Sequence, residues 1–215
     1  CYAAFNAFKA ADAFCRIDRK TKVLIVCIEL CSLHFQSQPT EDNLIANALF
    51  SDGAAAVLFE AETDAPVRLR PENFCSDLAI EGESDMAWSI GDQGFEMKLS
   101  TYVPSIIRNG IAKLTANLLS KISKQLSDVR YFAIHPGGRK ILECIENELG
   151  ITKEDNESAY HILRNHGNMS SPTVLFVLDE IMRRLTPLDD GECILSFAFG
   201  PGLTLESMIM KIEIE

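Results

Sequence analysis

The first sixteen residues constrain the fold of this chain more than any other segment. They have the pattern of a helix, in which aromatic residues and alanines leave one narrow polar stripe at Asn6, Lys9, Asp12 and Arg16. A helix that is apolar on nearly every side belongs inside a domain and not on its surface. We therefore expect this helix to be buried, with its alanines allowing neighbouring elements to approach closely.

Strand and helix patterns alternate along the rest of the chain. The continuous apolar runs at 23–28 and 54–59 are typical of strands that are buried on both faces of a sheet. Ser171 followed by Pro172 predicts the start of a helix, with the serine as the cap and the proline at the first helical position. This alternation predicts an α/β fold with at least some parallel sheet. The other expected elements are helices at 101–124 and 139–149 and strands at 131–134, 193–199 and 203–214.

The overall charge narrows the range of partners. The chain of 215 residues has a formal net charge of −11, which disfavours general binding to nucleic acid because that relies on clustered lysine and arginine. No apolar run reaches the roughly 18 residues that span a bilayer. We expect no nucleic-acid partner and no insertion into a membrane. The basic groups that could meet a phosphate are Arg139 and Lys140, or Arg16, Arg19, Lys20 and Lys22, although a solvated surface cluster is the better explanation of either set.

The cysteines favour a reducing, cytoplasmic environment. The sequence has seven of them without a C-x-x-C pair, and this odd, scattered set is unlike a secreted disulfide framework. Cys27, Cys31 and His34 form a C-x3-C-x2-H cluster that could hold zinc. Because no fourth ligand lies nearby and Cys27 ends a strand pattern, buried thiols are the better interpretation and we expect no metal.

Three residues stand where α/β proteins place reactive groups. Cys1 opens the first helix, whose N-terminal dipole favours a thiolate, although a lone cysteine is more often structural. His135 ends a short strand and precedes Pro-Gly-Gly, where glycine permits a ligand to approach the backbone. Asn168 lies just before the predicted helix at Ser171 and could either cap the chain or donate a hydrogen bond to an oxyanion.

Together with two further motifs, these residues resemble a known family. Five segments occur in the family's order: Cys1 opening an alanine-rich helix, Ala48–Ala56 (ALFSDGAAA), Ile134–Gly138 (IHPGG), Gly167–Ser171 (GNMSS) and Phe199–Thr204 (FGPGLT). In this combination the chain is similar to type III polyketide synthases, the chalcone and stilbene synthase family of the thiolase superfamily. The resemblance covers essentially the whole chain.

The resemblance implies a thiolase-like fold, a layered αβαβα arrangement made of two similar halves. Residues 1–62 would be the end of the first half and residues 63–215 the complete second half. The opening strands and helices of the first half would then be missing, and Cys1 would be an internal cysteine of a longer chain. The resemblance also implies that the full-length enzyme is a homodimer.

The resemblance also implies a mechanism. Cys1 would take a starter acyl group from a coenzyme A thioester, and His135 would pair with its thiolate. With Asn168, His135 would hold the carbonyl of malonyl-CoA while decarboxylation gives an enolate, which attacks the acyl group on Cys1. The substrates would be an acyl-CoA starter and malonyl-CoA, and the reaction would need no metal or redox cofactor.

Further residues match positions around the family's cavity. Phe50 and Phe95 correspond to two gating phenylalanines, although core packing is an alternative role for both. Cys31, His34 and Met86 replace small or hydroxyl residues of the plant enzymes, which predicts a different starter or a shorter product than a chalcone. The remaining site positions that the resemblance implies are Ser170 in the cavity and Gly200, Pro201 and Gly202 in a loop near the site.

Two alternatives remain at the level of sequence. A fatty-acid-type 3-ketoacyl synthase shares the Cys-His-Asn arrangement, although its histidine and glycine-loop motifs usually differ from those found here. The chain could instead be a fragment that is inactive alone, because its partner half would complete the same core. The apolar helix at 1–16 predicts that such a fragment would expose apolar faces and be insoluble or molten.

Overall fold

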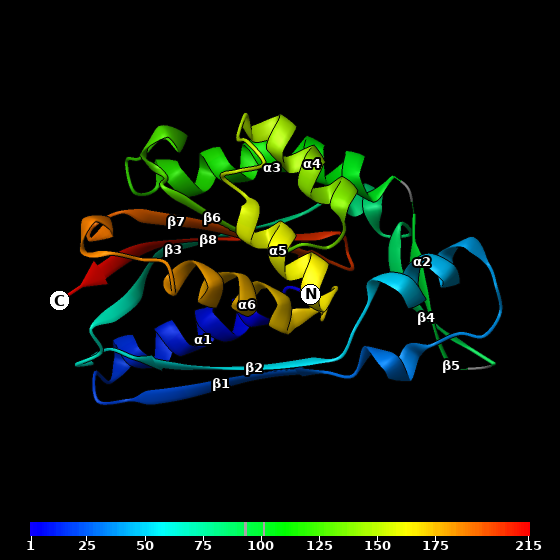
Figure 1. Cartoon of the computed structure of the whole chain (residues 1–215), viewed down its shortest axis with the longest axis horizontal. Coiled ribbons are helices and arrows are strands. Elements are labelled where there is room, and N and C mark those ends of the chain that lie inside the picture. The colour runs from blue at the N-terminus through cyan, green and yellow to red at the C-terminus, as the bar shows by residue number, and fades with distance from the viewer. Residues whose placement is uncertain (93, 101) are drawn as a thin grey trace.

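A computed structural model describes residues 1–92, 94–100 and 102–215. The chain forms four layers, in the order helices, sheet, helices and sheet (Figure 1). The helices are α1 (Ala3–Ile17), α2 (Glu41–Leu49), α3 (Val103–Ser120), α4 (Arg139–Leu149), α5 (Glu157–His166) and α6 (Ser171–Met182), with a short 3-10 helix η1 at Cys31–His34. The strands are β1 (Lys22–Glu29), β2 (Gly53–Glu60), β3 (Val67–Leu78), β4 (Met86–Gly91), β5 (Gly94–Leu99), β6 (Tyr131–Ile134), β7 (Cys193–Gly200) and β8 (Thr204–Ile214).

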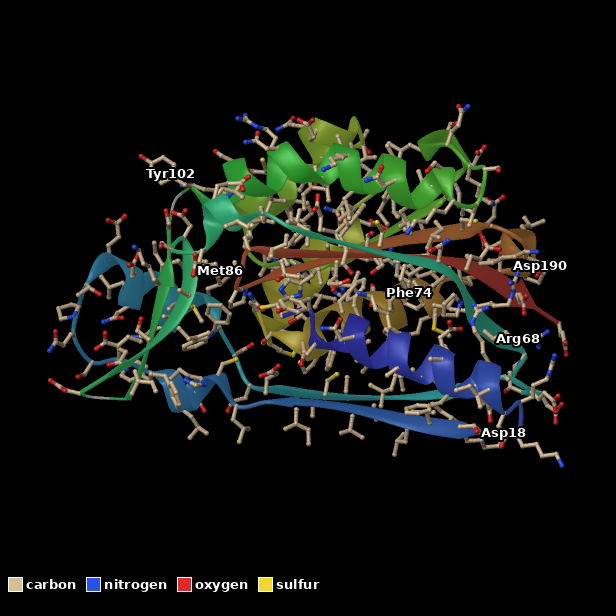
Figure 2. The ribbon with its side chains drawn as sticks, turned by 180° about the vertical axis from the view of Figure 1, so that it is seen from behind. Asp18, Arg68, Phe74, Met86, Tyr102 and Asp190 are labelled. Atoms are coloured by element: carbon tan, nitrogen blue, oxygen red, sulfur yellow. The ribbon has the colours of Figure 1, made fainter. Side chains whose placement is uncertain are left out.

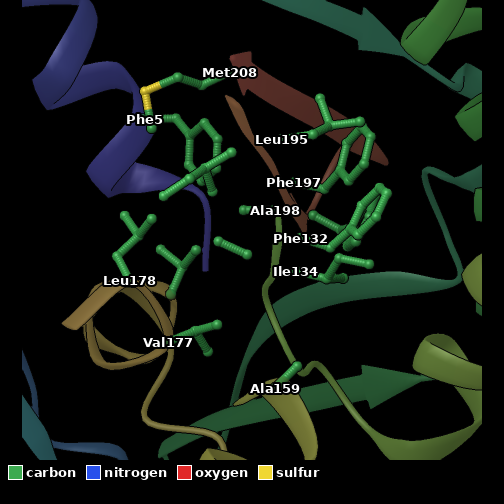
Figure 3. Packing of buried hydrophobic residues seen from close by; sticks show 14 of the residues in the cluster. Phe5, Phe132, Ile134, Ala159, Val177, Leu178, Leu195, Phe197, Ala198 and Met208 are labelled. Carbon is green, nitrogen blue, oxygen red and sulfur yellow. The ribbon is translucent and has the colours of Figure 1, made fainter. Parts of the chain in front are cut away.

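A four-stranded sheet in the order β3-β8-β7-β6 lies at the centre of the molecule. β6 runs parallel to β7, so the expected parallel pairing is confirmed, and the other two pairings are antiparallel. Every residue of β7 is buried because α3 and α4 cover one face of the sheet while α1 and α6 cover the other (Figure 1). Figure 3 shows the resulting core, where Phe5 of α1 lies near Met208 of β8 and Leu178 of α6.

The burial predicted for the first helix is only partly confirmed. α1 begins at Ala3, so Cys1 lies just before its first turn. Phe5, Phe8 and three small residues of the helix are buried, whereas Phe14 is 57% exposed. The prediction of burial on nearly every side is therefore wrong for one face, since no element of the described chain packs against it. On the buried face, Lys9 forms an ion pair with the buried carboxylate of Glu206, which ties α1 to β8.

The prediction that β1 and β2 are buried on both faces is also wrong. The two strands form their own antiparallel pair, and only one face of it packs on α1 and α6. Along the other face the pairs Leu24–Leu58, Val26–Ala56 and Ile28–Ala54 are exposed, and Leu24 is 65% exposed. In Figure 2 a row of side chains projects from this face, away from the rest of the molecule. Both faces of the strand pair are apolar, but no element of the described chain covers the outer one.

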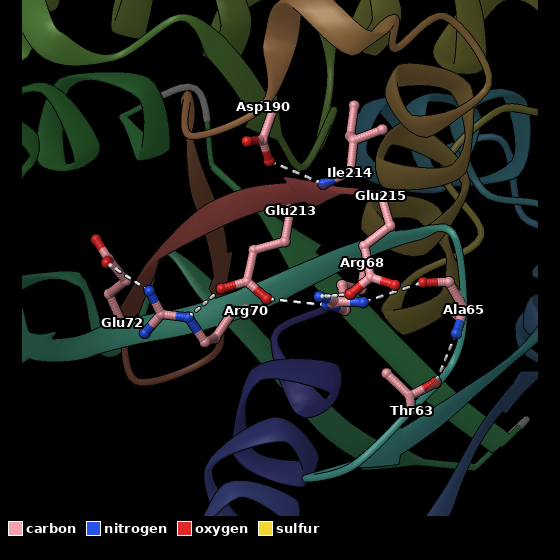
Figure 4. A network of polar contacts seen from close by, with 9 residues as sticks. All are labelled: Thr63, Ala65, Arg68, Arg70, Glu72, Asp190, Glu213, Ile214 and Glu215. Atoms are coloured by element: carbon pink, nitrogen blue, oxygen red, sulfur yellow. Dashed lines mark hydrogen bonds and ion pairs between the residues drawn. The ribbon is translucent and has the colours of Figure 1, made fainter.

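The other elements whose bounds were predicted lie close to those bounds. α4 has the predicted bounds, and α3 covers most of 101–124, although Thr101 lies outside the described residues. Polar edges also contribute to the fold: Glu213 of β8 binds both Arg68 and Arg70 of the edge strand β3 (Figure 4).

None of the described helices combines the length and apolar character needed to cross a membrane.

Candidate active site

A cavity of about 750 Å³ brings the three predicted reactive residues together. Cys1 enters it from the segment before α1, His135 from the end of β6 and Asn168 from the loop between α5 and α6. These residues are far apart in sequence and meet because α1 and α6 pack on the same face of the central sheet, to which β6 belongs. The other predicted positions in the cavity wall are Cys31, His34, Phe50, Met86, Phe95, Ser170 and Pro201.

The Cys1 thiol lies at the N-terminal end of α1. Its Sγ atom is 4.0 Å from Oδ1 of Asn168, which is a weak contact even for sulfur. The first turn of α1 contains no acidic residue and no side-chain cap, so its free N–H groups and dipole favour negative charge on the sulfur. In the same cavity the pKa of Cys31 is raised to about 11, mainly by burial and to a smaller extent by the negative charge of Glu29. Cys31 is therefore uncharged at neutral pH and is the poorer nucleophile.

His135 is buried with both of its ring nitrogens unpaired. The residue is 1% exposed, and neither Nδ1 nor Nε2 has a hydrogen-bond partner in the described part of the chain. Its backbone N–H donates to the carbonyl of Phe197, which continues the β6–β7 ladder and fixes where the side chain enters the cavity. Burial lowers the pKa of His135 to about 3. The imidazole is thus neutral, with one N–H available to a bound carbonyl oxygen.

The buried His135 predicts a loss of stability in acid. Its folded pKa of about 3 lies below the usual 6.5, so protons bind the unfolded chain first. The stabilising contribution is complete above about pH 6.5 and is lost as pH falls toward 3, by on the order of 5 kcal/mol. Urea unfolding of the complete enzyme across this pH range measures the free energy of unfolding. This free energy should fall less steeply with decreasing pH in His135→Gln than in the parent enzyme. His161→Gln, at an exposed histidine paired with Glu180, is the control and should retain the parental slope; equal slopes in parent and His135→Gln would contradict the prediction.

The backbone around Asn168 is held against the end of α2. The N–H of Asn168 donates to the carbonyl of Leu49 at 2.8 Å, and the N–H of Ser51 donates to the carbonyl of Asn168 at 3.0 Å. These bonds form an isolated parallel bridge between Phe50 and Asn168. Gly167 has φ +71°, and a Cβ there would lie 3.0 Å from both the Leu49 carbonyl oxygen and Ser51 Oγ. Only glycine suits this position, because another residue would push the two segments apart.

The side-chain amide of Asn168 is oriented by its own loop. The N–H of Ser170 donates to Oδ1 of Asn168 at 2.9 Å, which leaves the Nδ2 amide group as the donor side of Asn168 within the cavity. To make this bond, Ser170 adopts φ +60° and ψ −127°, a conformation that costs a non-glycine residue on the order of 1–3 kcal/mol. Backbone strain of this kind is concentrated at functional sites, where the surrounding structure holds it in place.

Glu29 fixes the far end of this loop and was not predicted from the sequence. One carboxylate oxygen accepts hydrogen bonds from the Ser171 hydroxyl at 2.6 Å and from its backbone N–H at 3.3 Å. The prediction that Ser171 caps α6 is therefore wrong: Ser170 occupies the cap position without a side-chain bond. The charge of Glu29 satisfies the helix N-terminus instead. Its only sequence signal is its position at the end of β1, two residues before Cys31.

Glu29 therefore predicts a selective defect. In the complete enzyme, Glu29→Ala should slow the malonyl-CoA decarboxylation that the sequence resemblance implies by about tenfold or more, because the Asn168 amide loses its fixed position. Acylation of Cys1 should change less. Glu29→Gln, which keeps an oxygen acceptor, is the matched control and should recover most of the rate. The double variant Glu29→Ala with Ser171→Ala should be no slower than Glu29→Ala alone, whereas additive losses would contradict a shared role.

The predicted glycine loop lies beside the cavity. Pro201 lines the cavity, but Gly200 and Gly202 are not in its wall. A Cβ at Gly200 would lie 2.5 Å from the ring of Tyr2, so this glycine allows the residue next to Cys1 to pack on β7. The cavity residues that the sequence did not predict are Glu29, Ser32, Phe35, Ala46, Asn47, Ser51, Asp52, Ala87, Trp88, Met97, Leu99, Gly137, Ile141 and Phe199. Within the described residues, no cluster of His, Cys, Asp or Glu has an arrangement suited to a metal ion, and this includes Cys27, Cys31 and His34.

Comparisons with solved structures identify the class of fold. The 1,3,6,8-tetrahydroxynaphthalene synthase of Streptomyces coelicolor, a bacterial type III polyketide synthase, superimposes with a TM-score of 0.91 at 27% identity, over 100% of this chain and 61% of that one. PKS-I from the brown alga Ectocarpus siliculosus gives a TM-score of 0.88 at 30% identity, over 97% of this chain and 57% of that one. The chain thus has the thiolase-like α/β fold of type III polyketide synthases.

Sequence comparison identifies the family. The profile for chalcone and stilbene synthases, C-terminal domain, matches residues 74–213. The alpha-pyrone synthesis polyketide synthase-like Pks18 of Mycobacterium tuberculosis is 32% identical over 216 residues, which are 99% of this chain and 55% of the relative. The chain belongs to the chalcone and stilbene synthase family, whose members are type III polyketide synthases. It spans between 55% and 61% of the length of the relatives named here.

Proposed function

We propose that this chain carries the reactive residues of a decarboxylative Claisen condensation between malonyl-CoA and an acyl group on Cys1. One observation carries the proposal: the Cys1 thiol, the unpaired ring of His135 and the Asn168 amide all line a single cavity. Residues 1–62 would contribute the end of a first thiolase-like half and residues 63–215 the second half. The full-length enzyme would be a homodimer.

The first step is acylation of Cys1. The thiolate attacks the carbonyl carbon of the starter thioester, a Cys1 Sγ–acyl bond forms, and the bond to the coenzyme A sulfur breaks. Coenzyme A leaves as a thiolate that takes up a proton. The N-terminal end of α1 stabilises the attacking thiolate, and the buried position of the site keeps water from hydrolysing the new thioester.

The second step makes the carbon nucleophile. The thioester oxygen of malonyl-CoA accepts hydrogen bonds from the neutral imidazole N–H of His135 and from Nδ2 of Asn168. Loss of CO₂ leaves its electron pair on the α-carbon as an enolate, whose negative oxygen these donors stabilise. Each donor supplies on the order of 3 kcal/mol. The enolate carbon then attacks the acyl carbon on Cys1, and the Sγ–acyl bond breaks to regenerate the thiolate.

The N-terminus of α4 suits the phosphate end of a coenzyme A thioester. Gly138 occupies the cap position without a capping side chain, and the first turn of α4 has no acidic residue. Arg139 and Lys140 occupy that turn. Arg139 pairs with Glu143 one turn further along, so Lys140 and the free N–H groups of the helix are the groups that would meet an anion. Gly137 places the loop before this helix in the cavity wall. No redox cofactor takes part in the proposed steps.

The test is acylation of the complete enzyme with matched thioesters. The same acyl group is offered on coenzyme A and on an acyl carrier protein, and intact-protein mass spectrometry follows its transfer to Cys1. We expect transfer from coenzyme A, followed by release of CO₂ from malonyl-CoA. Preferential transfer from the carrier protein would instead favour a fatty-acid-type 3-ketoacyl synthase, and no transfer from either donor would reject the proposal.

A further inference from the structure

One wall of the cavity is built mainly by one face of the β4–β5 hairpin, to which Ala87 on the other face adds a lining residue. The cross-strand pairs Met86–Leu99, Trp88–Met97 and Ile90–Phe95 place alternate residues on the same face. All six side chains are apolar, and all except Ile90 line the cavity. The intervening residues Ser89, Glu96 and Lys98 lie on the opposite face. The hairpin lies beside α2 at one end of the molecule (Figure 1), and Met86 marks its base in Figure 2.

Three rings meet at this wall. The His34 ring lies 4.5 Å from the Trp88 ring, measured between centroids, at an interplanar angle of 50°. The Phe95 ring approaches the same histidine edge-on at 5.5 Å. His34 belongs to η1, so its ring connects the hairpin to the segment that follows β1. Within the described residues Nδ1 of His34 is buried and has no hydrogen-bond partner, so the ring is held by its aromatic neighbours.

Trp88 combines packing with access. Its side chain packs on His34 and faces the cavity, yet the residue remains 42% exposed. A large ring that is supported on one side and open on the other provides a firm surface for an apolar ligand. The polar groups of the cavity, in contrast, include the thiol, imidazole and amide of the proposed reaction. The cavity therefore has chemically different regions for the reacting thioester and for the rest of the acyl chain.

We propose that Trp88 is a specificity-determining residue that, supported by His34, limits the length of the acyl chain carried on Cys1. This inference rests on the proposed function, because it assigns the starter an apolar acyl chain that extends from Cys1 to the hairpin. Chains that reach Trp88 without displacing it gain the contact, whereas longer chains must move the ring away from His34. Met86 and Met97 are flexible and tolerate different chain shapes, so the rigid ring sets the limit.

The test compares Trp88→Ala with Trp88→Phe in the complete enzyme. Acyl-CoA starters from acetyl to palmitoyl are offered in turn, and acylation of Cys1 and product mass are recorded. Trp88→Ala should raise relative acylation by the starters just beyond the parental limit by roughly tenfold, which is the discrimination that a hydrophobic pocket achieves for a small size difference. Trp88→Phe should stay close to the parent. Ile90→Ala is the matched control, since Ile90 lies on the same hairpin face outside the cavity and is 87% exposed.

An unchanged starter profile in Trp88→Ala would overturn the inference. An equal shift in Ile90→Ala would also overturn it, because general loosening of the hairpin would then explain the effect. A parent that accepts no acyl-CoA would instead reject the proposed function itself, so the two failures are distinguishable.

Fluorescence gives a readout that does not depend on the folding of Trp88→Ala. Trp88 is the only tryptophan among these 215 residues, and Trp88→Phe subtracts the signal of any other tryptophan in the complete enzyme. Acylation of Cys1 with the longest accepted starter should change the Trp88 emission, while acylation with an acetyl group should change it little. Complete acylation by the long starter without any Trp88-dependent change would contradict a contact with the acyl chain.

Discussion

Cys1→Ala in the complete enzyme is expected to abolish acyl transfer while malonyl-CoA decarboxylation continues. The acyl group loses its only proposed attachment atom, so the overall condensation should fall by on the order of 10⁴-fold or more. Decarboxylation needs the hydrogen bonds of His135 and Asn168, and Cys1 contacts this pair only through a 4.0 Å approach to Asn168 Oδ1. Intact-protein mass spectrometry measures the first step, and CO₂ release measures the second.

The matched control is Cys75→Ala, a partly buried cysteine on β3 outside the cavity. It should retain both steps. Acyl transfer that persists in Cys1→Ala would show that another residue is the nucleophile. A folded Cys1→Ala protein that has lost decarboxylation would contradict the division of roles between the thiol and the two donors.

The 215-residue chain produced alone is expected to be inactive and either insoluble or molten. The outer face of the β1–β2 pair is exposed and presents six apolar residues, which form the pairs Leu24–Leu58, Val26–Ala56 and Ile28–Ala54. Covering one large aliphatic side chain is worth about 1.5–3 kcal/mol, so this face favours aggregation until another segment packs on it. The measurements are the soluble fraction, binding of a hydrophobic dye and near-ultraviolet circular dichroism.

A triple variant distinguishes this face from other causes of poor solubility. Leu24→Thr, Ile28→Thr and Leu58→Thr together should raise the soluble fraction of the chain alone, since threonine keeps the strand propensity. Leu188→Thr, at an exposed site away from β1 and β2, is the control and should have little effect. A sharp cooperative melt together with thioester turnover by the unmodified 215-residue chain would contradict the prediction.

The sequence predicted best those elements whose signals are local. α4 begins directly after Gly138 and ends at Leu149, just before Gly150, which has φ +68°, and both glycines are visible in the sequence as helix boundaries. β6 likewise ends where His135 and Pro136 follow an apolar run. The motifs around Cys1, His135 and Asn168 identified a family, and the structure places all three residues in one cavity.

The features that escaped prediction depend on distant contacts. Burial of a strand face depends on what covers it, so the apolar residues of β1 could not show that one face is open. Glu29 bonds to Ser171, which lies 142 residues further along the chain, and an isolated glutamate at a strand end has no distinguishing pattern. Trp88 and His34 meet only because η1 folds back beside the hairpin. Local periodicity contains no information about such pairings.

The backbone bridge between Phe50 and Asn168 matters for attempts to redesign the substrate range. A phenylalanine at the cavity wall is a natural first target, but the residues on either side of Phe50, Leu49 and Ser51, make the two backbone hydrogen bonds to Asn168. A backbone shift at Phe50 would move a donor that stabilises the enolate, so altered selectivity there would bring a slower reaction. Trp88 and Met86 belong to a separate hairpin that has no hydrogen bond to Cys1, His135 or Asn168 among the described residues. Variation in that hairpin can change which acyl groups fit while the reaction chemistry stays intact.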